Sequence, residues 1–144
     1  MKMSVKLLSI TTLLVAAVLV GCKKDSADST QNYRADCNGA NEAPPNSSTA
    51  TATFNGTYNS DTKTFSGTLA YNGITPTGWH IERGTTTTRG SIVVSLGAVV
   101  SSPFTFSVTL DAAAEAELKS GGYYINVQSL AYPSGEIRGK LVAQ

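Results

Sequence analysis

The last part of the chain alternates apolar and polar side chains, and this pattern restricts the fold more than any other feature. Tyr123, Ile125 and Val127 fall on every second position, as expected for a β-strand with one buried face. Pro-Ser-Gly at 133–135 predicts a reversal of direction, because proline presets φ and glycine supplies a positive φ. The segment 136–142 then resumes the pattern. We therefore predict a closing β-hairpin.

Further segments show the same alternation, or a short apolar run between turn formers, and six more strands are predicted: 34–38, 49–58, 64–71, 79–83, 91–96 and 104–110. The strand 91–96 has Ile-Val-Val at its centre, so we expect it to be covered on both faces. One helix is predicted at 111–119, with Asp111 as its N-cap and a Gly pair as its stop. About eight short strands and one small helix predict an all-β antiparallel β-sandwich or Greek-key barrel.

The N-terminal segment has the features of an export signal. Residues 1–6 form a basic segment with two lysines. Residues 7–20 form an apolar run that is shorter than the roughly 20 residues of a membrane-spanning helix. The run ends in Leu-Val-Gly-Cys at 19–22, which resembles the bacterial lipobox. The resemblance implies a lipoprotein signal peptide at 1–21, cleavage before Cys22, and acylation of Cys22. The alternative is an ordinary secretory signal with an incidental cysteine.

Cleavage before Cys22 would leave 123 residues, enough for one domain with a core. Residues 22–32 are polar apart from Cys22 and one alanine, so we expect a flexible tether there, followed by a β-sandwich domain at 33–143. Lys-Lys-Asp at 23–25 resembles the surface-export signals of some Gram-negative lipoproteins. It is equally compatible with a solvated tether end.

Charge and cysteine content exclude several kinds of protein. The mature chain would carry nine basic and ten acidic residues, without a basic stripe, so no nucleic-acid partner is expected. With Cys22 acylated, Cys37 has no disulfide partner, and we interpret it as a small buried apolar residue.

Three segments together resemble one family: Gly-Ala-Asn-Glu-Ala-Pro-Pro at 39–45, Trp-His-Ile at 79–81, and the closing segment from Tyr123 to Leu141. They resemble the CHRD domain, named for chordin and found in bacterial secreted proteins and lipoproteins, over residues 33–142. The resemblance implies an immunoglobulin-like β-sandwich or barrel with a faint similarity to copper/zinc superoxide dismutases. It implies no established molecular activity. Because chordin is an extracellular antagonist of growth-factor signalling, ligand binding is the natural analogy.

Many members of that family carry His-x-His in the middle strand and a further histidine before the closing turn. Here His80 matches the first position, but Glu82 and Gln128 stand at the other two. One imidazole, one carboxylate and one amide make a poor copper or zinc site, so we expect no metal and no cofactor. The alternatives are a weak metal site and a hydrogen-bonded polar cluster in which Glu82 holds His80 or pairs with Arg83 or Arg138.

The sequence offers little for catalysis. It contains a single histidine, no G-x-S-x-G element, no P-loop and no G-x-G-x-x-G, so we predict that the protein is not an enzyme.

Two sets of residues are candidates for other roles. Glu42 and Arg138 are expected to form an ion pair that joins the first loop to the closing hairpin. Trp79, Tyr124 and Tyr132, beside the polar loop 85–89, are candidates for an exposed binding surface. The alternative for Trp79 and most of the tyrosines is packing in the core.

The leading hypothesis is a lipid-anchored, non-catalytic domain that binds or presents an extracellular protein or glycan at the cell envelope. We expect it on the outer membrane or the cell surface, with the membrane as a partner through its anchor. The alternative is a metal-binding or redox protein with a superoxide-dismutase-like barrel. A third hypothesis is an envelope structural protein without a ligand.

Overall fold

The computed structural model describes residues 29–98 and 101–144. The predictions of a signal peptide at 1–21, of lipidated Cys22 and of a tether up to residue 28 lie outside the described residues. Across the part that is described, no helix has the length and apolar character needed to cross a membrane.

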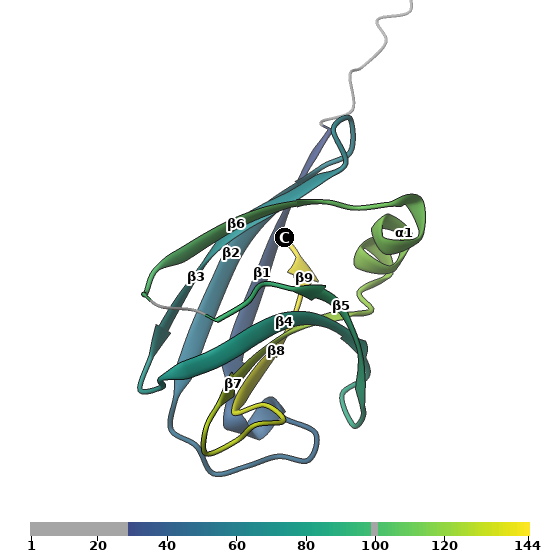
Figure 1. The fold of residues 1–144 in the computed structure, drawn as a ribbon. Helices are drawn as coiled ribbons and strands as arrows, with labels where there is room; N and C mark the ends of the chain where they lie inside the picture. Colours follow the sequence, from purple (N-terminus) through teal and green to yellow (C-terminus); the bar gives the residue numbers. More distant parts are fainter. Residues whose placement is uncertain (1–28, 99–100) are drawn as a thin grey trace, which may run out of the picture.

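The described chain is mostly β-strand, with one α-helix and one short 3₁₀ helix (Figure 1). In chain order the elements are β1 (Thr30–Asn38), η1 (Gly39–Asn41), β2 (Thr51–Asn59), β3 (Thr64–Asn72), β4 (Pro76–Gly84), β5 (Arg89–Ser95), β6 (Phe104–Thr109), α1 (Ala112–Ser120), β7 (Tyr123–Ser129), β8 (Ile137–Lys140) and β9 (Val142–Ala143). The predicted all-β class with one helix is confirmed.

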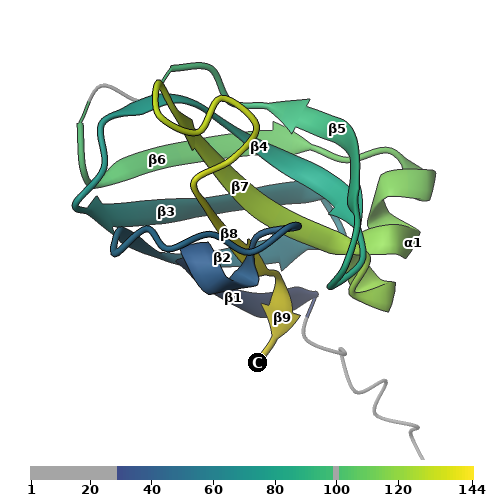
Figure 2. The same cartoon turned by 90° about the horizontal axis from the view of Figure 1, so that it is seen from below.

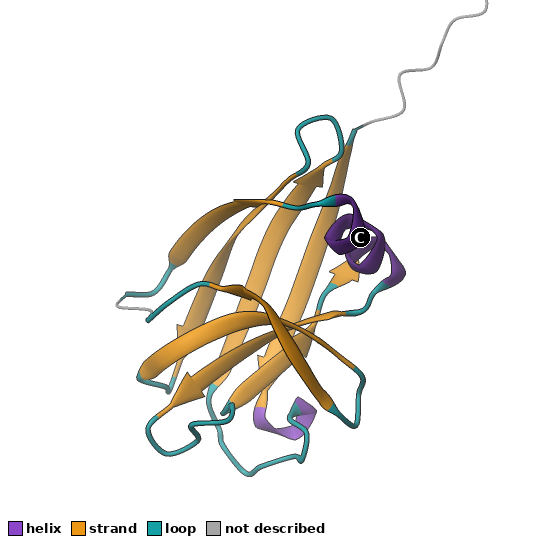
Figure 3. Ribbon diagram, turned by 45° about the vertical axis from the view of Figure 1, so that its right-hand side comes forward, coloured by secondary structure: helices purple, strands orange, loops and turns teal. Residues whose placement is uncertain are grey.

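All the strands belong to one antiparallel sheet in the order β5-β4-β7-β8-β1-β2-β3-β6, with β9 paired to β1. The sheet curls, so that the half made of β4, β5, β7 and β8 lies across the half made of β1, β2, β3 and β6 (Figures 1 and 3). The halves join where β8 pairs with β1, through Asn38 and Arg138. The result is the sandwich-like half-barrel that the strand pattern predicts.

The core lies between the two halves. Phe54, Phe65 and Phe106 pack against one another from β2, β3 and β6, with ring centroids 5.6–5.7 Å apart. From the other half, Trp79 meets Phe106 edge-on, at 5.4 Å between centroids. Burying aromatic side chains of this size is the largest apolar contribution available to a small domain.

Two local predictions are confirmed in detail. The hairpin of β2 and β3 keeps its register from Thr51 opposite Asn72 to Asn59 opposite Thr64. Helix α1 is capped by the Asp111 side chain, which accepts a hydrogen bond from the Ala114 amide at 2.8 Å. Gly121 ends the helix in the left-handed conformation, with φ of 75°.

Three predictions need correction. Strand β1 begins at Thr30, inside the predicted tether, because Thr30 to Asn32 pair with β2. Strand β5 is not covered on both faces: it is the last strand of the sheet, and Ile92 is 52% exposed. The prediction for strand β7 is wrong in the opposite direction: one buried face was expected, and both faces are buried.

Candidate functional site

The second buried face belongs to β4, β7 and β8, on the side of the sheet away from the core. The register places His80 opposite Asn126, and Asn126 opposite Arg138, in one row across the three strands. Their neighbours along the strands, such as Ile81 and Ile125, point into the core. The row is nevertheless buried: Asn126 and Arg138 are each 0% exposed.

Loops from distant parts of the chain cover this face. They are the first loop (residues 39–50), the β4–β5 loop (85–88) and the β7–β8 turn (130–136). Figure 2 shows the first loop and the β7–β8 turn side by side at this end of the molecule. The first loop is held to the turn by Asn46, whose Nδ2 donates to the Glu136 carbonyl at 2.9 Å, and by Ser48, whose Oγ donates to Glu136 Oε1 at 2.6 Å.

We define the polar cluster as the buried or half-buried polar side chains under these loops: Glu42, His80, Glu82, Asn126, Gln128 and Arg138. Five of them are residues that the sequence singled out, and the structure brings them to one face. Asn126 is the residue that sequence reasoning missed. Its position in the alternation of β7, between Tyr124 and Gln128, was the signal that could have found it.

Asn126 connects the cluster. Its Nδ2 donates to Glu82 Oε2 at 3.1 Å, so the predicted partners of Glu82 are wrong. Glu82 instead lies beside Asn126, and its Oε1 is 3.9 Å from Arg89 Nη2. Arg83 pairs with Glu117 of helix α1.

His80 uses one ring nitrogen within the cluster. Its Nε2 lies 3.3 Å from Gln128 Oε1, a hydrogen bond in which the imidazole nitrogen donates. Glu82 is turned toward Asn126 instead. Within residues 29–98 and 101–144, no three His, Cys, Asp or Glu side chains lie close enough to hold a metal ion. These residues therefore do not fit the copper or zinc site of a superoxide-dismutase-like protein.

The predicted Glu42–Arg138 ion pair is not formed at bonding distance. Arg138 Nη2 donates to the Thr88 carbonyl at 3.1 Å, and the guanidinium lies 3.9 Å above the centre of the Tyr124 ring. Its Nε and Nη1 have no hydrogen-bond partner in the described part of the chain. Arg138 acts on Glu42 only as a nearby charge.

Glu42 is the least satisfied carboxylate of the cluster. One of its oxygens, Oε2, accepts a long 3.4 Å bond from the Ala43 amide, whereas Oε1 is buried without a partner. Burial raises the pKa of Glu42, while the Ala43 amide and the charges of Arg138 and Arg89 partly oppose the rise.

Gly135 lies against the unpartnered oxygen of Glu42. A Cβ added to Gly135 would lie 2.6 Å from Glu42 Oε1 and 2.5 Å from Asn126 Oδ1, so these two oxygens are at most about 5 Å apart. Asn126 Oδ1 is also buried and unpartnered. Two acceptor oxygens cannot bond each other, but a protonated Glu42 can donate to the amide oxygen. The raised pKa of Glu42 acts in the same direction, toward the protonated form.

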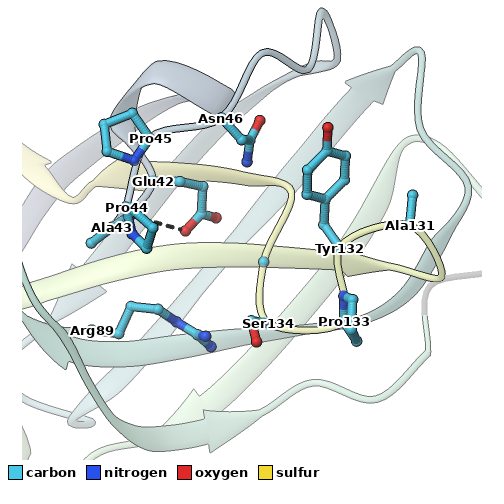
Figure 4. A pocket seen from close by; sticks show the side chains of 11 residues that line it. Glu42, Ala43, Pro44, Pro45, Asn46, Arg89, Ala131, Tyr132, Pro133 and Ser134 are labelled. Atoms are coloured by element: carbon cyan, nitrogen blue, oxygen red, sulfur yellow. Dashed lines mark hydrogen bonds between the residues drawn. The ribbon is translucent and has the colours of Figure 1, made fainter.

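A pocket of about 430 Å³ opens above Glu42, between the first loop and the β7–β8 turn (Figure 4). Arg89 lines one side, and Figure 4 shows its guanidinium reaching beneath Glu42 toward Ser134. Tyr132 stands on the opposite side. Arg89 was not singled out by its sequence pattern, since it lies at the end of a polar loop.

The prediction of an exposed aromatic binding surface is only partly confirmed. Trp79 is 0% exposed and packs edge-on against Phe104 in the core, and Tyr124 is buried beneath Arg138. The prediction that these two residues form an exposed binding surface is therefore wrong. Tyr132 alone lines the pocket and is half-buried.

We compared the sequence with models of known protein families. The family model of the CHRD domain matches residues 33–141. The chain belongs to the CHRD domain family. No curated protein and no solved structure matched it. The matched span of the CHRD domain begins inside β1 and ends just after β8, so it includes every residue of the polar cluster and of the pocket.

Proposed function

We propose that this CHRD domain is a non-catalytic binding module, held at the cell envelope by acyl chains on Cys22. The observation that carries the proposal is the position of the pocket. Strand β1 begins at Thr30 and runs to the end of the molecule that carries the first loop and the β7–β8 turn (Figure 1). Nine extended residues span about 30 Å. A domain anchored through its N-terminal segment would present the pocket on its far side.

The length of the intervening segment supports the same arrangement. Seven residues, 23–29, separate Cys22 from the start of β1. Such a segment reaches at most about 25 Å. The domain would therefore stay close to the bilayer, with the pocket directed away from it. Several acyl chains, at about 0.8 kcal/mol per buried CH₂, would make the attachment lasting.

The non-catalytic part of the proposal is supported by His80. It is the single histidine of the sequence, and its Nε2 faces the Gln128 amide oxygen. A histidine that acts as a general base needs a nucleophile within hydrogen-bonding distance, and an amide oxygen does not serve as one.

Metabolic labelling with an alkyne fatty acid tests the anchor. We expect the full chain to incorporate the label and to sediment with membranes, and Cys22→Ala to lose both properties. Cys37→Ala is the matched control, because Cys37 is the other cysteine and lies buried in β1, where burial raises the pKa of its thiol. The Cys37→Ala variant should keep the fatty-acid label. Unlabelled wild-type protein, or a labelled Cys22→Ala variant, contradicts the proposal.

A further inference from the structure

Arg89 is a charged side chain whose hydrogen-bonding capacity is unused. It forms an ion pair with Glu82 Oε1, which lies 3.9 Å from Nη2 and therefore beyond hydrogen-bonding distance. No hydrogen bond from its guanidinium occurs within residues 29–98 and 101–144, and the side chain is 32% exposed and lines the pocket. A guanidinium offers five N–H donors in a planar fork, which suits a carboxylate bound through both oxygens.

The floor of the pocket gives a second, independent indication of a ligand. Glu42 is 3% exposed and lines the pocket, and its Oε1 is unpartnered just beneath Gly135. Buried polar groups without partners are rare in folded proteins, and one that faces a pocket can be satisfied by ordered water or by a bound ligand. In its protonated form, which burial favours, Glu42 does not repel an anion above it.

The local charges favour a ligand with a single negative charge over a dianion. Arg89, Arg138 and Glu82 are the groups whose charges act on Glu42. When Glu42 is protonated, the form that burial favours, these four groups carry one surplus positive charge. A monoanion such as a carboxylate balances it. A phosphate dianion would leave an uncompensated charge beside Glu82, which is itself 1% exposed.

The walls of the pocket favour a compact ring over an extended peptide. They include three prolines, Pro44, Pro45 and Pro133. Prolines have no N–H, so they offer no ladder of backbone donors to an extended chain. Their CH-rich faces and the Tyr132 ring instead suit the flat side of a sugar ring. The volume, about 430 Å³, lies in the range of small-molecule sites.

We propose that this pocket binds a hexuronic acid unit, with Arg89 holding the carboxylate and the prolines and Tyr132 packing against the ring. This inference rests on the proposed binding function and names its ligand class.

Calorimetric titration of the full chain, extracted in non-ionic detergent, tests it with three probes that differ only at carbon 6. They are D-glucuronate, D-glucose and D-glucose 6-phosphate. Because a charge-assisted bidentate contact separates them, glucuronate should bind at least about tenfold more tightly than either of the others. Absence of glucuronate binding to the folded protein overturns the proposal. Equal binding of all three probes does so as well.

Variants of the two arginines of this hairpin sharpen the test. Arg89→Gln should reduce glucuronate affinity by about tenfold or more, and Arg89→Lys by less, since lysine keeps the charge without the fork. Arg83→Gln is the matched control: Arg83 is exposed on the same hairpin and pairs with Glu117, away from the pocket. The glucuronate affinity of the Arg83→Gln variant should not change. Melting temperatures within a few degrees of wild type would show that each variant folds.

Two results would reject this inference without rejecting the proposed function. One is glucuronate affinity that survives Arg89→Gln. The other is binding of a short N-acetylated peptide with a free terminal carboxylate in place of glucuronate, which would make the pocket a peptide-end site. Loss of fatty-acid labelling, by contrast, would reject the anchored role and leave the binding measurement untouched.

Discussion

The two faces of strands β4, β7 and β8 are buried to the same extent by different means. Ile125 and Asn126 are neighbours on β7, each is 0% exposed, and they point to opposite sides of the sheet. Ile125 packs in the apolar core against the other half of the sheet. Asn126 lies under loops, between the carboxylates of Glu82 and Glu42.

The difference shows that burial alone does not define a core. On the inner face, stability comes from apolar area, and side chains of similar volume can replace one another. On the outer face it depends on a small number of hydrogen bonds and on the balance of charges, so the loss of one partner leaves another buried and unpaired. The outer face should therefore tolerate only replacements that keep the hydrogen-bond partners of their neighbours.

The largest effect is expected for Arg138→Ala. Arg138 is fully buried, and its removal takes away a positive charge near Glu42, the bond to the Thr88 carbonyl and the packing on Tyr124. We expect a loss of about 3 kcal/mol or more in the free energy of unfolding, measured by urea denaturation. Arg138→Met should recover part of it by filling the volume.

Arg34→Ala is the control for this prediction. Arg34 pairs with Asp36 at 2.8 Å on the surface of β1, with both side chains largely exposed. Solvated pairs of this kind contribute little, so the urea midpoint should barely move. Equal effects for Arg138 and Arg34 would show that the outer face behaves as ordinary surface.

A matched pair on β7 gives the next largest effect. Asn126→Leu keeps the shape of the side chain but leaves Glu82 Oε2 buried without its donor. It should cost about 2 kcal/mol. Ile125→Leu conserves volume on the apolar face and should cost under about 1.5 kcal/mol. Thermal unfolding of both variants measures the difference, and a larger loss for Ile125→Leu would reverse our description of the two faces.

The smallest effect concerns the proton on Glu42. Burial raises the pKa of Glu42 in the folded state above its ordinary value, so folding favours the protonated form. The associated stability is present below the ordinary pKa of a glutamate and is lost as the pH rises through the raised value.

Glu42→Gln removes this titration and supplies an amide that can donate to Asn126 Oδ1 at every pH. At neutral pH we expect the variant to be more stable by about 1 kcal/mol, or about 4 °C in melting temperature. Below pH 4 the two proteins should converge. A difference in melting temperature that does not change between pH 4 and pH 8 would show that Glu42 is charged in the folded protein.

The strand pattern predicted most of the fold because it is local. The alternation in β2, β3 and β7 follows from side chains pointing to opposite faces of a strand, and the Asp111 cap follows from neighbours on one helix. What failed depended on distant contacts. The apolar run of β5 resembles a central strand, yet β5 lies at an edge of the sheet because no further strand of the described chain pairs with it.

The candidate site was predicted as a set of residues, but its internal contacts were not. Residues from the first loop, the middle strand and the closing hairpin were expected together, and they share one face. Their partners differ from expectation, since Arg138 bonds Thr88 and Glu82 bonds Asn126. Bonding partners depend on the ångström-scale placement of loops that are far apart in sequence, and no local pattern encodes it.

The sequence by itself determined that this chain forms antiparallel strands closed by a hairpin, because the two-residue period and the turn formers act over a few residues. Only the tertiary structure decided that Trp79 is core, that a polar row is sealed beneath loops, and that Arg89 and Glu42 face one pocket. The physical reason is that burial and charge balance are properties of what packs above a side chain. That covering comes from segments tens of residues away.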